Sequence, residues 1–182
     1  MKKWLSKVLL RLAGWKASSL EGVHLPKCVI CVAPHTSNWD FVVGKLFYTS
    51  QGLTAGFLMK KDWFFFPFNY IFRSMGGIPI DRSRQRSVTD QVAEMFRERK
   101  HFQVAITPEG TRKKTNDWKK GFYYIALKAQ VPILMAYFDY AKKEVGTKGV
   151  FYPTGDAEGD ILKIRRFFND VSACHPENFC TV

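Results

Sequence analysis

The chain has 182 residues and a mass of 21.0 kDa, which is enough for one domain with a complete hydrophobic core. Its hydrophobic content of 46% excludes general disorder, and no apolar stretch approaches the roughly 20 residues of a membrane-spanning helix. Lysine and arginine number 28 against 16 acidic residues, a formal charge of +12, so we expect an anionic partner such as phospholipid, nucleic acid or a phosphorylated substrate.

Residues 1–17 are predicted to form a short, basic amphipathic helix. Lys7 and Arg11 interrupt its apolar residues, so we do not expect a cleaved signal peptide. Such a helix can lie at a lipid interface or pack on the protein's own core, and the sequence leaves both interpretations open. The apolar residues at helical spacing are Trp4, Leu5, Val8, Leu9, Leu12 and Trp15.

A buried strand is predicted at 28–33 and an amphipathic helix at 40–50, with His35 between them. His35 therefore lies just past a strand end, where α/β proteins keep their chemistry. Asp40 is expected near the first turn of the helix, where its carboxylate can fold back onto His35, fix the tautomer and stabilise the imidazolium. The alternative is a solvated turn in which Asp40 is merely a favourable first-turn acid.

The cysteines are predicted to be free thiols in a reducing compartment. Cys28 and Cys31 lie three positions apart in the predicted strand, so their side chains should point to opposite faces of the sheet. That arrangement excludes a redox pair or half of a zinc site. Cys174 and Cys180 lack flanking histidines at metal-ligand spacing, so no metal site is expected.

A second strand is predicted at 53–60, and an aromatic-rich segment follows it at 63–72. These aromatic side chains either fill a core or line an apolar groove or membrane-facing rim. The glycine pair before 78–80 permits a tight turn into a short strand that ends at Arg82. A helix is predicted at 87–100.

The strand predicted at 102–106 leads into a loop with Glu109 and Arg112, which could pair with each other or meet a ligand. The remaining elements are a helix at 121–129, a strand at 131–140, a hairpin at 142–152 turning at 146–149, and a helix at 157–169 opened by Asp156.

Strands that alternate with helices predict a single α/β domain with a mostly parallel central sheet covered by helices. We place this domain at 18–170, after the helix at 1–17 and before a polar, mobile tail at 171–182. In such a sheet, His35, Arg82 and the loop 109–112 can converge on one edge. The chain contains neither a Gly-x-Ser-x-Gly elbow nor a glycine-rich phosphate loop.

Four sequence blocks carry a resemblance to a known family. The His-x4-Asp pattern at 35–40, the block at 76–82, Pro-Glu-Gly-Thr-Arg at 108–112 and Val-Pro-Ile at 131–133 resemble, in order and spacing, the motifs of the glycerolipid acyltransferase family of the lysophosphatidate acyltransferase type. The resemblance implies transfer of an acyl group from acyl-CoA or acyl carrier protein to the hydroxyl of a lysophospholipid-like acceptor such as 1-acylglycerol-3-phosphate. The thioester is a co-substrate, and no further cofactor is implied.

The resemblance also implies roles for individual residues. His35, oriented by Asp40, is the expected general base, and Arg82 with Arg112 is expected to hold an anionic head group. The remaining expected substrate-binding residues are Glu109, Gly110 and Thr111 at the acceptor pocket, and Lys60 and Lys61 at donor or lipid phosphates.

We expect peripheral association with an anionic membrane surface on its cytoplasmic side. Two alternatives stay open: an acyltransferase for a different lyso-lipid, for example an amino-acid-containing one, and a non-catalytic basic lipid-binding module. Nucleic acid is not an expected partner, because the basic residues flank apolar clusters and do not form one stripe.

Overall fold

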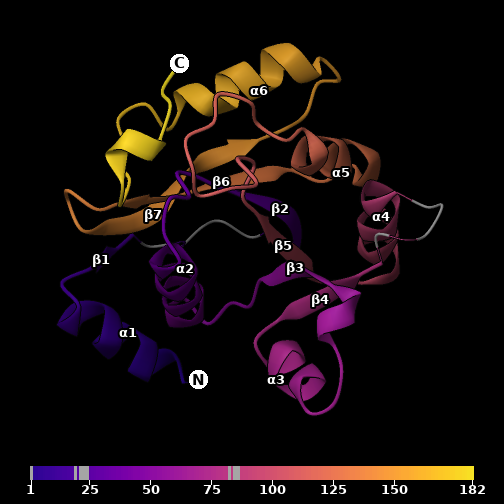
Figure 1. The fold of residues 1–182 in the computed structure, drawn as a ribbon, viewed down its shortest axis with the longest axis horizontal. Helices are drawn as coiled ribbons and strands as arrows, with labels where there is room; N and C mark the ends of the chain where they lie inside the picture. The colour runs from indigo at the N-terminus through magenta and orange to yellow at the C-terminus, as the bar shows by residue number, and fades with distance from the viewer. Residues whose placement is uncertain (1, 19, 21–24, 82, 84–86) are drawn as a thin grey trace.

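The computed structural model describes residues 2–18, 20, 25–81, 83 and 87–182 (Figure 1). Arg82 lies outside the described residues. Within them the strands are β1 (Lys16–Ala17), β2 (Lys27–Val32), β3 (Gly56–Lys60), β4 (Gly77–Ile80), β5 (Phe102–Ile106), β6 (Ile133–Asp139) and β7 (Glu144–Phe151). The helices are α1 (Lys3–Leu12), α2 (Trp39–Ser50), α3 (Phe68–Ser74), α4 (Val88–Glu98), α5 (Gly121–Ala129) and α6 (Ala157–Arg166), with short 3-10 turns η1 (Lys61–Trp63) and η2 (Pro176–Asn178).

The strands form one sheet in the order β1-β7-β6-β2-β5-β3-β4, in which β6 and β7 are antiparallel and the other neighbouring pairs are parallel. Helices α4, α5 and α6 cover one face, and α1 and α2 cover the other (Figure 1). The predicted α/β domain with a mostly parallel sheet is thus confirmed. Because both faces are covered, the central strand β2 is apolar along nearly its whole length.

Each face of the sheet has its own hydrophobic core, and β2 contributes to both. Cys31 packs with α4, α5 and α6, whereas Cys28 packs with α1 and α2. The prediction that these two thiols point to opposite faces is therefore confirmed. Cys31 is paired in register with Ile106 of β5, and Val32 with Ala136 of β6. The loops after β2, β5 and β6 consequently meet at the same edge of the sheet.

The prediction of a hairpin turning at 146–149 is wrong. The chain turns at 140–143 instead, and β7 runs through both glycines beside β6. A Cβ atom at Gly146 would lie 2.2 Å from Oγ of Ser18. Gly146 therefore permits a close approach of two segments inside the sheet, and it does not make a turn.

The aromatic segment at 63–72 begins at the last residue of η1, passes through the connection 64–67 and continues into α3. Most of its aromatic side chains are exposed, and Phe66 is 80% exposed. Of the two predicted fates, core or exposed rim, the structure shows the exposed one for Trp63, Phe65, Phe66, Phe68 and Tyr70. Phe68 and Phe72 stack on each other with ring centroids 6.2 Å apart, so each ring covers part of the other's apolar surface.

Helix α1 packs on the protein's own core and also has exposed apolar side chains. Leu10, with Trp15 just beyond the helix, is buried in the core shared with α2, while Trp4 and Leu12 are exposed. One row of apolar side chains thus packs on the domain and another faces outward. Among the described residues, no helix is long and apolar enough to cross a membrane.

The C-terminal segment 171–182 packs against the carboxyl edge of the sheet. Val171 and Ala173 are buried, and the carbonyl of Ser172 accepts a hydrogen bond from the Tyr140 N–H at 2.8 Å. The N–H of His175 donates to Oγ1 of Thr36 at 3.0 Å. The sequence suggested a mobile tail because its polar composition does not reveal these backbone contacts.

Candidate active site

The loop after β2 brings His35 and Asp40 together. His35 follows the carboxyl end of the strand, and Asp40 is in the first turn of α2. His35 Nδ1 lies 3.1 Å from Asp40 Oδ2. The carboxylate therefore folds back onto the ring as the spacing predicted, and this contact assigns the ring proton to Nδ1. Nε2 then carries the lone pair that can accept a proton.

Asp40 is buried, with 2% of its surface exposed, and several donors point at its carboxylate. Oδ2 accepts hydrogen bonds from the N–H groups of Thr36 at 3.0 Å and Ser37 at 2.9 Å. Oδ1 accepts one from the Tyr140 hydroxyl at 2.6 Å. These donors, together with the positive end of the α2 dipole, stabilise negative charge on a side chain that faces an imidazole.

His35 lies at the mouth of a groove of about 1000 Å³ between α2 and the sheet. This volume is in the range of sites that hold small-molecule ligands. The mouth is polar and also contains Asn38, Thr111 and Arg112, whereas the interior is mostly apolar. The apolar side chains that line the groove include Ile30, Val32, Phe41, Phe47, Phe57, Leu58 and Phe138. A base at the end of an apolar groove suits a reacting group attached to a hydrocarbon chain.

Glu109 lies behind the histidine loop and not among the residues that line the groove. Both of its carboxylate oxygens accept the backbone N–H of His35, each at 3.1 Å, and the side chain is buried. Burial raises the pKa of Glu109 to about 7, with the His35 N–H opposing the rise. The geometry therefore suits a carboxyl group that holds the His35 backbone, which differs from the predicted position in an acceptor pocket.

We expect Glu109→Gln to weaken the pH dependence of stability. Because the folded-state pKa lies above the ordinary 4.5, the folded protein binds a proton here that the unfolded chain has released. This stabilising contribution is full below about pH 4.5 and is lost as the pH rises through about 7. Between pH 5 and pH 8 the wild-type protein should lose on the order of 3 kcal/mol more than the variant. Thermal unfolding at both pH values measures the difference.

The control for this prediction is Glu98→Gln, which changes an exposed glutamate near the end of α4. It should keep the pH dependence of the wild-type protein. Equal pH dependence in Glu109→Gln and the wild-type protein would contradict the buried, partly protonated state of Glu109.

The other predicted substrate-binding residues that the structure describes occupy two different places. Gly110, Thr111 and Arg112 line the groove, and the Arg112 guanidinium donates to Oδ1 of Asn38. Glu109 and Arg112 thus meet different partners and do not pair with each other. Lys60 and Lys61 are exposed at the carboxyl end of β3 and do not line the groove.

Lys61 Nζ lies 3.5 Å from Asp81 Oδ2. Arg82 is outside the described residues. Among the described residues, no group of three or more histidine, cysteine, aspartate or glutamate side chains could hold a metal ion.

Sequence reasoning did not identify Tyr140 as part of the site. Tyr140 was predicted as the last residue of a strand, and it directly follows β6 in the structure. Tyr140 lies just beyond the carboxyl end of β6, which is parallel to β2, and a side chain at such a position can reach the loop after β2. This position in the predicted sheet is the sequence signal that could have identified Tyr140.

A model of the family described as Acyltransferase matches residues 18–138 of this chain. The chain belongs to this family. The matched range contains His35, Asp40 and the loop 109–112, and it ends before Tyr140 and the C-terminal segment.

Two curated proteins match parts of the chain. The 1-acyl-sn-glycerol-3-phosphate acyltransferase beta of Homo sapiens is 30% identical over 112 residues, which are 58% of this chain and 40% of that protein. The 1-acyl-sn-glycerol-3-phosphate acyltransferase of Cocos nucifera is 34% identical over 83 residues, which are 42% of this chain and 27% of that protein. The matches therefore span less than half the length of these relatives.

A solved structure shares the fold. The crystal structure of the 1-acyl-sn-glycerophosphate acyltransferase PlsC from Thermotoga maritima aligns with a TM-score of 0.61 at 19% sequence identity. The alignment covers 88% of this chain and 72% of that chain. The described residues thus share their overall fold with this acyltransferase.

Proposed function

We propose that this protein transfers a fatty acyl group from a thioester donor, acyl-CoA or acyl carrier protein, to the hydroxyl of a lysophospholipid-like acceptor such as 1-acylglycerol-3-phosphate. The observation that carries the proposal is the His35–Asp40 pair at the polar mouth of an apolar groove. Family membership and the names of the curated relatives support it. The activity would place the protein in membrane phospholipid synthesis.

The proposed reaction is a direct transfer without an acyl-enzyme. Nε2 of His35 removes the proton of the acceptor hydroxyl while the oxygen of that hydroxyl attacks the thioester carbonyl carbon. The tetrahedral intermediate then collapses, the carbon–sulfur bond breaks, and the imidazolium returns the proton to the departing thiolate. Asp40 is adjacent to Nδ1, so it stabilises the ring during the period when it carries positive charge.

The donors for the oxyanion are proposed to come from the loop 110–112. The N–H of His35 donates to Glu109, and those of Thr36 and Ser37 donate to Asp40. These three groups are therefore already occupied. The Gly110 N–H donates to the carbonyl of Thr107. Thr111 and Arg112 line the groove mouth close to His35, so their backbone N–H groups, or the guanidinium N–H groups of Arg112 that do not contact Asn38, can meet the developing negative charge.

The head group of the acceptor is proposed to bind to cations at the mouth of the groove. Arg112 lines this mouth, and Arg82 is assigned here from its sequence block. A guanidinium suits a phosphate because its planar fork donates two parallel hydrogen bonds. Lys60 and Lys61 lie outside the groove, so we assign them to donor or lipid phosphates at its rim.

One assay tests the proposed activity. Labelled acyl-CoA and acyl carrier protein donors are offered to a panel of lyso-lipids that includes lysophosphatidate, other lysophospholipids and an amino-acid-containing lyso-lipid. We expect an ester product that requires both substrates. A product with another lyso-lipid would reassign the acceptor. Vesicle binding without any product, and unchanged by His35→Ala, would favour the non-catalytic lipid-binding module instead.

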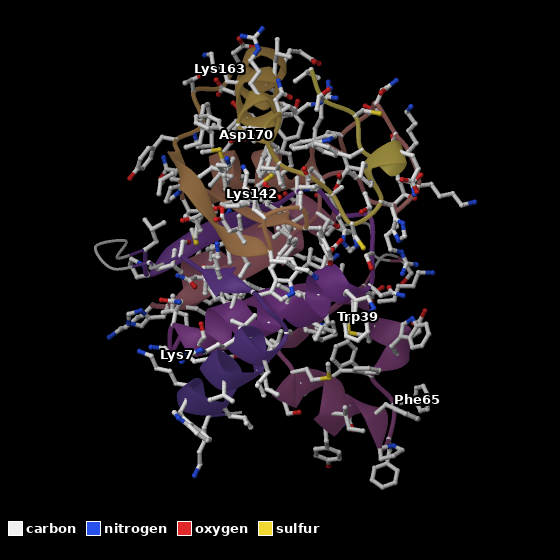
Figure 2. All side chains as sticks on the ribbon, turned by 90° about the vertical axis from the view of Figure 1, so that its left-hand side faces the viewer. Lys7, Trp39, Phe65, Lys142, Lys163 and Asp170 are labelled. Atoms are coloured by element: carbon white, nitrogen blue, oxygen red, sulfur yellow. The ribbon has the colours of Figure 1, made fainter. Side chains whose placement is uncertain are left out.

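An anionic membrane surface, on the cytoplasmic side, is the proposed site of action. Exposed apolar side chains lie on α1 and on the segment 63–71. The exposed cations near α1 are Lys2, Lys3, Lys7 and Arg11, and those near the segment 63–71 are Lys60, Lys61 and Arg73. Figure 2 shows Phe65 projecting from the body of the molecule below Trp39, on the same side. Exposed aromatic rings next to cations suit an interface of acyl chains and anionic head groups.

Replacing both Phe65 and Phe66 with serine should weaken binding to vesicles of phosphatidylglycerol and phosphatidylcholine by about tenfold or more. Burying an exposed phenylalanine contributes about 1.5–3 kcal/mol when burial is complete, and these rings are already partly covered. Cosedimentation measures the affinity, and added salt should weaken it further. The control Tyr152→Ser changes an exposed aromatic residue after β7 and should bind normally. Equal binding of both variants would exclude this surface.

A further inference from the structure

The Asp40 carboxylate has a contact partner beyond the matched family range. Its Oδ2 atom faces His35 and two backbone N–H groups, whereas Oδ1 accepts the Tyr140 hydroxyl at 2.6 Å. Tyr140 is 100 residues from Asp40 in the sequence and follows β6. The family match ends at residue 138, so it does not include this tyrosine.

Tyr140 is held on several sides. Its N–H donates to the carbonyl of Ser172 at 2.8 Å, so the C-terminal segment fixes its backbone. Its ring packs edge-on against Trp15, with centroids 5.0 Å apart. Burial, with Asp40 and Cys174 adding to it, raises the pKa of the Tyr140 hydroxyl well above its ordinary value. The hydroxyl therefore remains protonated and donates to the carboxylate.

We propose that Tyr140 is a positioning residue of the catalytic pair, whose hydroxyl fixes the rotation of the Asp40 carboxylate and takes up part of its negative charge. A hydrogen bond to a carboxylate withdraws charge from both oxygens, including the one that faces the imidazole. Tyr140 thus sets how strongly Asp40 holds the protonated His35. This inference rests on the proposed function for its effect on rate, whereas its effect on His35 can be measured without any substrate.

Other titratable groups surround the pair, so the test must change one atom. Glu109 faces the His35 backbone from the loop after β5, Cys174 approaches Tyr140 from the C-terminal segment, and Arg112 contacts Asn38 beside the ring. Tyr140→Phe removes the hydroxyl and keeps the ring that packs on Trp15. Asp40 then has one donor fewer, so its charge should hold the imidazolium more strongly.

We expect the His35 ring of Tyr140→Phe to take up its proton at a pH higher than in the wild-type protein by about 0.5–1 unit, which corresponds to about a threefold to tenfold change in the proton-binding constant. Turnover should fall by a similar factor on the acidic limb of the pH–rate profile and recover at higher pH. The KM values of donor and acceptor should stay within about twofold, since Tyr140 does not line the groove.

The experiment is an NMR titration of the histidine rings in the wild-type protein, Tyr140→Phe and Tyr123→Phe, with His35 assigned by its absence from His35→Ala. Tyr123 is the matched control, because its hydroxyl donates to another buried carboxylate, Asp160, at 2.8 Å in the core of the opposite face. Its loss should lower stability and leave the His35 titration unchanged. The pH–rate profiles of the same proteins give the second measurement.

An upward displacement of the His35 titration in Tyr140→Phe, absent in Tyr123→Phe, is the expected result. Coinciding titrations, or a downward displacement, would overturn the proposal even if Tyr140→Phe melts at a lower temperature. If the wild-type protein transfers no acyl group from any donor, the proposed function fails, while the titration still decides whether Tyr140 acts on His35.

Discussion

His35→Ala is expected to lower turnover by about 10² to 10⁴-fold while the protein remains folded. General-base assistance contributes a factor of this size when a positioned side chain removes the proton in the transition state. Nε2 of His35 is the proton acceptor of the proposed reaction, and alanine supplies no substitute. Product formation from a saturating thioester donor and acceptor measures the effect, so a loss of substrate affinity does not obscure it.

The fold should survive because few structural contacts of His35 involve its ring. The backbone N–H keeps its bond to Glu109, and the ring is partly exposed at the mouth of the groove. Asp40 keeps Tyr140 and its two backbone donors. The control His101→Ala changes an exposed histidine just before β5 and should retain full activity. Wild-type turnover in a folded His35→Ala protein would exclude the proposed mechanism.

Asp40→Asn should reduce turnover by about 10² to 10⁴-fold with little loss of stability. The asparagine side-chain oxygen can replace Oδ2 as the acceptor for Thr36, Ser37 and His35. The asparagine NH2 group can donate to the Tyr140 oxygen, so Tyr140 changes from donor to acceptor. Residue 40 then keeps a hydrogen bond to each of these partners, with the direction of the one to Tyr140 reversed, and the negative charge is lost. An imidazolium next to a neutral amide is less stable, so the rate falls.

Asp40→Ala is the matched comparison that separates charge from structure. It leaves the N–H groups of Thr36 and Ser37 without their buried acceptor, and each buried donor left unpaired costs about 1–3 kcal/mol. We therefore expect both substitutions to impair turnover and Asp40→Ala to lower the melting temperature as well. Thermal unfolding and turnover of the two variants measure the separation. If Asp40→Asn destabilised the protein but kept normal turnover, Asp40 would have only a structural role.

These two predictions concern residues that local sequence patterns brought to attention. An apolar run long enough for a buried strand, followed by helix-capping residues, placed His35 beyond a strand end and Asp40 at a helix start. The same local rules predicted the strand Phe102–Ile106 and the helix Gly121–Ala129, with bounds that the structure reproduces. Asp156 also caps α6 as predicted, since its carboxylate accepts the Gly159 N–H.

The errors have a common physical cause. Gly146 suggested a turn, although it instead permits a close approach to Ser18, a residue far away in the sequence. The C-terminal segment suggested a mobile tail, although its backbone bonds to Thr36 and Tyr140. In both cases the deciding contact joins segments that are neighbours in space and distant in the chain, and a local pattern contains no information about such a contact.

The sequence by itself determined the class of fold, the position of the histidine and its carboxylate, and the family, because each depends on residues close together in the chain. The tertiary structure decided what surrounds that pair. Glu109 reaches the His35 backbone across 74 positions and Tyr140 reaches Asp40 across 100. Both contacts exist because β5 and β6 flank β2 and end at the same edge of the sheet, and that strand order is set by long-range packing of the two cores.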